Sequence, residues 1–138
     1  MQYYSISAFR EALNKLLKKP KDGYTSVVND ICNDFKEKTI DEIRNNRDMV
    51  FDDKTYRIVK LRLPNSLQKL SKSNGFRLIY YVNKKKDEVV FLYVYPKRGN
   101  LGLITISQER IISLLGDLIQ ESQDNKLTEM NSISGFQI

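Results

Sequence analysis

Basic side chains recur at alternating positions in segments that the sequence predicts to be β-strands. Successive side chains of a strand point to opposite faces, so Lys60 and Arg62 share one side of their segment. In the next predicted strand, Arg77 shares a side with Tyr81, and Arg98 follows the end of a third one. If these strands converge on one concave face, the four cations form a compact site for an anion such as a phosphate group, with Tyr81 at its edge.

Lysine and arginine side chains can hold a phosphodiester and also help to cleave it. Cations stabilise charge that develops on the phosphate, and an amine with a lowered pKa can accept a proton. The chain contains no histidine, which removes the imidazole acid–base pair, Ser-His and Cys-His nucleophilic sites and His-ligated zinc. Basic residues on the solvent-exposed face of a sheet more often increase solubility than take part in catalysis, and this alternative to a phosphate site stays open.

The composition favours one basic domain with an anionic partner. The 138 residues include 41% apolar residues, enough for a core, and 23 Lys and Arg against 17 Asp and Glu, for a net charge of +6. Between residues 57 and 98, only Asp87 and Glu88 oppose the basic residues. Cys32 is the single cysteine, which excludes an internal disulfide and a CxxC site. No secretory leader or membrane-spanning stretch is evident, so we expect a cytoplasmic protein.

The elements that must position these cations follow from periodicity and turn signals. The predicted strands cover residues 3–7, 56–63, 76–83 and 88–96. The predicted helices cover residues 8–19, 24–39 and 107–122, with a short helical turn at 40–48. The order is that of an α+β fold. Residues 51–55 are predicted to be a loop, and residues 123–138, which are polar with few apolar anchors, a loose C-terminal tail. The pair Asn74-Gly75 predicts a turn before the third strand, because both residue types tolerate positive φ.

The ordered segments resemble a known family. A basic strand "YRIVKLRL", a loop, "KSNGFRLIYYV", a hairpin, "VVFLYVYPKR" and a terminal helix are similar to the RelE/ParE superfamily of bacterial type II toxin–antitoxin toxins. Members of the HigB kind carry a similar K-S-G-G-x-R-x-I-Y-Y block. The resemblance extends from about Tyr56 to Leu115. It implies one toxin domain over residues 1–122, with an extra helical region at about 24–54, a small antiparallel-rich sheet and helices packed on one face.

Members of the RelE branch are metal-independent endoribonucleases that cut messenger RNA in the ribosomal A site. The resemblance therefore implies an enzyme without metal or cofactor, with mRNA and the ribosome as partners and a cognate antitoxin that neutralises it. It leaves the oligomeric state unknown.

The resemblance also implies roles for individual residues. Arg77 matches the arginine that binds the scissile phosphate, and Lys60 matches one of two basic strand residues, a candidate general base. Arg98 matches the arginine after the last strand, which assists the transition state or the leaving group. The candidate RNA-binding residues are Arg62, Lys72, Tyr81 and Lys97.

The chain departs from the family pattern at two positions, and these keep other functions open. Ile58 stands where the second strand lysine is expected, and "GNLGLITIS" after Arg98 contains no match for the terminal tyrosine of some members. One alternative is a ParE-like toxin that inhibits DNA gyrase by binding it. Another is a non-catalytic relative that binds nucleic acid without cleaving it, with salt-sensitive affinity.

Overall fold

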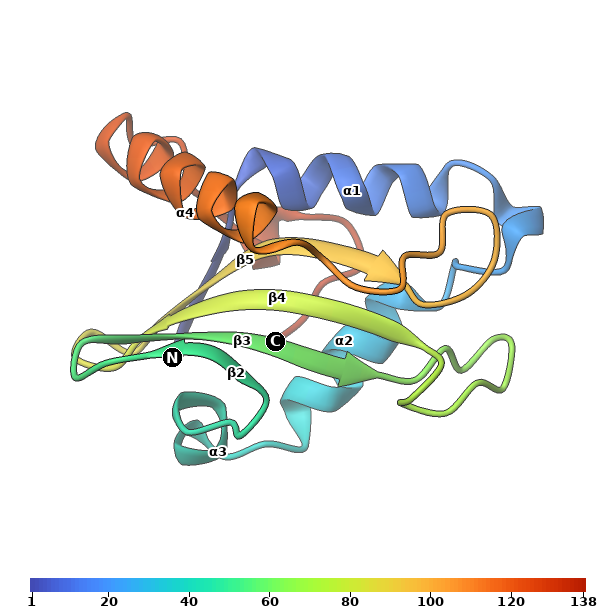
Figure 1. Ribbon diagram of the computed structural model, residues 1–138, viewed down its shortest axis with the longest axis horizontal. Helices are drawn as coiled ribbons and strands as arrows, with labels where there is room; N and C mark the ends of the chain where they lie inside the picture. The colour runs from blue at the N-terminus through green and yellow to red at the C-terminus, as the bar shows by residue number, and fades with distance from the viewer.

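A six-stranded, mostly antiparallel sheet with helices on both faces forms the structure, a computed structural model that describes residues 1–138 (Figure 1). The strand order is β2-β3-β4-β5-β1-β6, and only β1 and β5 are parallel neighbours. The strands are β1 (Gln2–Ser5), β2 (Met49–Asp52), β3 (Tyr56–Leu63), β4 (Phe76–Asn83), β5 (Glu88–Pro96) and β6 (Thr128–Glu129). The α-helices are α1 (Ser7–Leu17), α2 (Val27–Lys36), α3 (Ile40–Arg44) and α4 (Gln108–Gln123), and 3₁₀ turns cover Pro20–Asp22 and Met130–Ser132.

The mixed α+β class and the three central strands are confirmed. The strands β3, β4 and β5 have the bounds expected from sequence, and each is antiparallel to the next. The expected loop at 51–55 is wrong in its first part, because Phe51 and Asp52 end β2, which pairs with β3 at the edge of the sheet.

The expectation that the helices share one face of the sheet is corrected. The helices α1, α2 and α3 contribute side chains to a large apolar cluster with one face, whereas α4 packs against the other. In Figure 1, α4 (orange) lies on the opposite side of the β3–β4 ribbon from α2 and α3. Both faces need cover because the central strands are apolar on both: Val59 and Leu61 face the first cluster, Ile58 and Ile79 the second.

The C-terminal residues belong to the core, in place of the expected loose tail. The short strand β6 pairs with β1, and the following turn buries Met130 completely. Phe136 is 2% exposed and packs edge-on against Phe9 of α1, with ring centroids 6.3 Å apart. Few apolar residues suffice here because each fills a position in an existing cluster. The fold therefore continues past residue 122.

None of the helices is long and apolar enough to cross a membrane.

Candidate functional site

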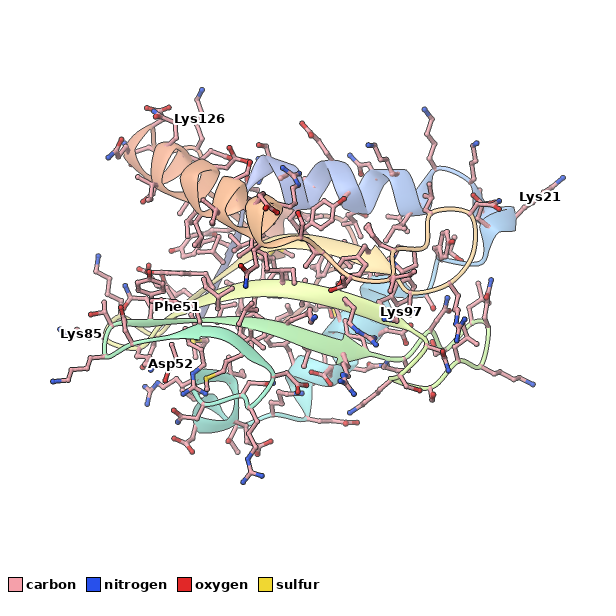
Figure 2. All side chains as sticks on the ribbon, in the orientation of Figure 1. Lys21, Phe51, Asp52, Lys85, Lys97 and Lys126 are labelled. Atoms are coloured by element: carbon pink, nitrogen blue, oxygen red, sulfur yellow. The ribbon has the colours of Figure 1, made fainter.

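Basic side chains gather on the α4 face of the sheet, at the end where β3 and β5 finish and β4 begins. We call Lys60, Arg62, Arg77 and Lys97 the cation cluster. In the strand register, Arg62 is opposite Arg77, and Arg77 is opposite Tyr95, so these three side chains form one row across the sheet. Figure 2 shows Lys97 at this end of the sheet, with Lys85 of the β4–β5 turn at the other end. The structure thus brings together three residues predicted from alternation with a fourth from the end of β5.

A second row runs beside the first. Lys60 is opposite Ile79, and Ile79 is opposite Tyr93. Ile79 is fully buried on the face of the sheet that α4 covers. The row therefore has a cation at one end and an aromatic ring at the other. The cluster is therefore flanked by the two tyrosines of β5.

Arg77 is the most buried cation of the cluster. Its side chain and backbone together are 6% exposed. Nη1 donates to the carbonyl oxygens of Lys72 (2.8 Å) and Phe76 (3.1 Å), and Nη2 donates to that of Ser73 (3.0 Å). A guanidinium has five N–H groups, so the Nε–H and one Nη2–H are left without a protein acceptor. Burial lowers the pKa of Arg77, but an arginine remains charged in proteins.

No carboxylate neutralises the cluster. The ion pairs of the molecule involve other cations, namely Arg10, Lys38, Arg44, Arg57 and Lys84. The charge of the Asp48 carboxylate raises the pKa of Arg77, but Asp48 makes no ion pair with it. A buried cation without an anionic partner is costly, and the hydrogen bonds that Arg77 donates to neutral carbonyls offset that cost only in part. The cation cluster is therefore suited to an anionic ligand.

Lys97 has an ammonium group with a lowered pKa. Burial lowers the pKa of its ammonium group, and the nearby charges of Arg77, Lys60, Arg98 and Arg62 lower it further. Its Nζ donates to the carbonyl oxygen of Ile104 at 2.6 Å. Burial and crowded cations thus give this amine a larger neutral, proton-accepting fraction at a given pH than a free lysine has. The sequence predicts Lys97 as an RNA-binding residue but gives no signal of its lowered pKa, because that pKa depends on how the strands are paired.

The two tyrosines beside the cluster have different environments. Tyr95 is 4% exposed; burial raises the pKa of its phenol, and the Ile106 amide and the Arg77 cation partly oppose that rise. Tyr93 is half-buried, and the guanidinium carbon of Arg110 lies 5.2 Å from its ring centroid. Tyr95 is therefore a core residue, whereas Tyr93 packs against the apolar clusters and keeps part of its side chain accessible.

Arg98 lies at the margin of the cluster and holds the loop before β4. Its Nε and Nη2 donate to Oδ1 of Asn74 at 3.0 and 2.7 Å, while the Tyr24 hydroxyl donates to the Arg98 carbonyl at 2.8 Å. Arg77 binds two carbonyls of the same loop, from Lys72 and Ser73. The two arginines therefore fix residues 71–75 beside the site.

Gly75 lets this loop approach β3 closely. A Cβ at this position would lie 2.1 Å from the carbonyl oxygen of Leu63, a backbone atom that cannot move aside. The expected turn is present, with the Asn74 amide donating to the Ser71 carbonyl, but neither Asn74 nor Gly75 has a positive φ. The glycine is needed for space rather than for a left-handed backbone.

Two of the predicted RNA-binding residues lie away from the cluster. Tyr81 is four residues from Arg77 along β4, a separation of roughly 13 Å, and it packs against Tyr56, with ring centroids 5.4 Å apart. It lines a groove between the sheet and α4 at the opposite end. The side chain of Lys72 is exposed on the loop, and only its carbonyl contacts the cluster.

No group of three or more Cys, Asp or Glu side chains is placed to hold a metal ion. Comparison with protein-family models, with curated proteins and with solved structures returns no match to this chain.

Proposed function

We propose that the protein is a RelE-like toxin, an endoribonuclease that cleaves mRNA on the ribosome and is neutralised by a cognate antitoxin. The observation that carries this proposal is the cation cluster, in which a buried arginine with free N–H groups lies among three other basic side chains without a carboxylate. RNA supplies a dense row of phosphates for such a site. It also carries its own nucleophile, the 2′-hydroxyl next to the scissile phosphate.

Cleavage needs an in-line 2′-oxygen, a proton acceptor and positive charge around the phosphate. The neutral amine of Lys97 accepts the 2′-hydroxyl proton as the 2′-oxygen bonds to phosphorus, since burial and the neighbouring cations lower its pKa. The bond from phosphorus to the 5′-oxygen breaks, and the products are a 2′,3′-cyclic phosphate and a 5′-hydroxyl. Arg77 and Arg62 stabilise the charge on the phosphate oxygens. Lys60, on the same face, supplies the proton that the 5′-oxygen takes up.

Controlled expression in a bacterial host tests the proposal. New mRNA 5′ ends are mapped after induction, together with growth. Growth arrest with cuts in phase with codons would support ribosome-dependent cleavage. Arrest with intact mRNA, or no arrest together with no cleavage of ribosome-bound mRNA by the purified protein, would contradict it.

The rate of cleavage is expected to rise with pH through the pKa of Lys97. Below that pKa the ammonium form predominates and cannot accept a proton, so the rate increases as the neutral fraction grows. Burial and four neighbouring cations place this rise below the pH at which a free lysine titrates. Single-turnover rates on a short mRNA bound to ribosomes, measured for the wild type and for Lys97→Arg, check this prediction. The variant keeps the positive charge but does not titrate, so its pH profile should be flat where the wild type rises. A rise retained in Lys97→Arg would assign the base to another group.

A second candidate function, binding to a protein target such as gyrase, is favoured by an exposed apolar edge of the sheet. The end strand β2 exposes Met49, Val50 and Phe51 by 52, 41 and 47%. The unpaired edge of such a strand can accept an extended segment of another protein. Loss of gyrase supercoiling activity with intact mRNA would favour this function over cleavage. Salt-sensitive RNA binding without either effect would identify a non-catalytic relative.

A further inference from the structure

We propose that Tyr93 and Arg110 form a stacking platform for one unpaired base of a single-stranded RNA, next to the cation cluster. The inference rests on the proposed function in one respect, that the anion held by the cluster is an RNA phosphate. It adds a binding site for the base and so names the substrate class as single-stranded.

The platform joins two elements that are distant in sequence. Tyr93 belongs to β5 and is half-buried, whereas Arg110 belongs to the first turn of α4 and is exposed. The guanidinium carbon lies 5.2 Å from the ring centroid. The Arg110 amide donates to the side-chain oxygen of Ser107, the N-cap residue, at 3.1 Å, and this bond fixes the turn that carries the arginine. One planar cation thus covers one aromatic ring at the protein surface.

The platform lies close to the phosphate ligand that we assign. Tyr93 is opposite Ile79, two residues from Arg77 in β4, so Tyr93 and Arg77 are diagonal neighbours about 7–8 Å apart. Tyr93 and Tyr95 have ring centroids 6.2 Å apart. The register between β4 and β5 shifts at Ile79 and Tyr80, and such a bulge alters the direction of nearby side chains. A nucleotide with its phosphate at Arg77 can therefore place its base on the Arg110–Tyr93 pair.

The chemistry of the pair suits a base better than a second phosphate. Aromatic rings and guanidinium planes both stack on bases that are free of a partner strand. Arg110, like the cluster, makes no ion pair with a carboxylate, so its plane is available. In a duplex the base edges and faces are occupied, so this platform selects single strands.

Fluorescence titration with two probes tests the platform. One probe is a labelled oligoribonucleotide of eight uridines, and the other is a strand of the same length that carries abasic riboses at its central positions. The wild type should bind the first about tenfold more tightly, because one stacked base contributes a factor of this order. Tyr93→Leu should reduce that ratio to about one while its affinity for the abasic strand is unchanged. Arg110→Lys keeps the charge but lacks the plane, and should also lower the ratio.

Tyr56→Leu is the matched control, since Tyr56 is a half-buried tyrosine on the same face at the other end of the sheet. It should keep the wild-type ratio. A purely structural role of Tyr93 in holding α4 would weaken binding of both strands equally, and that result would overturn the platform. An unchanged ratio in both platform variants would do so too. Cleavage of ribosome-bound mRNA by the same preparations separates the two proposals: base preference without cleavage contradicts the nuclease, and cleavage without base preference contradicts the platform.

Discussion

Replacement of Arg77 by alanine is expected to lower the single-turnover rate of RNA cleavage by about 10²–10³-fold, the usual cost of one preorganised donor at a developing oxyanion. The effect is large because Arg77 is the buried member of the cation cluster, and a buried charge acts on a phosphate through a lower dielectric than an exposed one. Its two free N–H groups are the donors that the phosphate would engage. In cells, the same variant should no longer arrest growth.

Arg77 also binds three backbone carbonyls, so loss of cleavage must be separated from loss of the fold. Urea unfolding of Arg77→Ala measures the structural cost. Arg77→Lys is a second variant, which keeps one charge but cannot bridge the loop and a phosphate together, and should be impaired as well. Arg57→Ala is the matched control: this arginine lies on the same sheet and pairs with Asp52, away from the cluster, and should retain the wild-type rate. A folded Arg77→Ala that cleaves at the wild-type rate would refute the assigned role.

The side-chain pattern of the β-strands and the turn residues between them are sufficient to predict the three central strands. Strong β-formers fill residues 76–83 and 88–96, and a charged turn separates them, so local sequence determines both elements. Alternation also placed Lys60 and Arg62 on one face. Local sequence does not predict which face of the sheet α4 covers. It packs on the face opposite α1, because both faces of the central strands are apolar.

The parts of the site that sequence missed depend on contacts between distant elements. Arg110 reaches Tyr93 only after α4 packs on the sheet, and no spacing in the chain indicates that contact. The lowered pKa of Lys97 likewise needs the register that sets Arg62 beside Arg77. Conversely, Tyr81 shares a face with Arg77 and is expected from sequence at the edge of the site, yet it lies four positions further along the strand.

Phe136→Ala is expected to lower the free energy of unfolding by about 3–5 kcal/mol, the usual range for a buried phenylalanine. The side chain is 2% exposed and packs on Phe9, which is itself fully buried between α1 and the sheet. Removing the ring would leave a cavity in the larger apolar cluster rather than an exposed end of chain. Urea unfolding followed by circular dichroism measures the change, and Gln137→Ala, at an exposed neighbouring position, is the control.

A loose tail would give a different result, because a change in an unpacked segment usually alters stability by less than about 0.5 kcal/mol. Equal urea unfolding midpoints for Phe136→Ala and Gln137→Ala would therefore support the loose C-terminal tail that is expected from the sequence. A large difference would mean that α1 depends on residues that follow α4, since Met130 and Phe136 fill the cluster from the C-terminal side. Removal of residues 127–138 should then abolish the cooperative transition, because it takes away both buried side chains and the antiparallel neighbour of β1 in a single step.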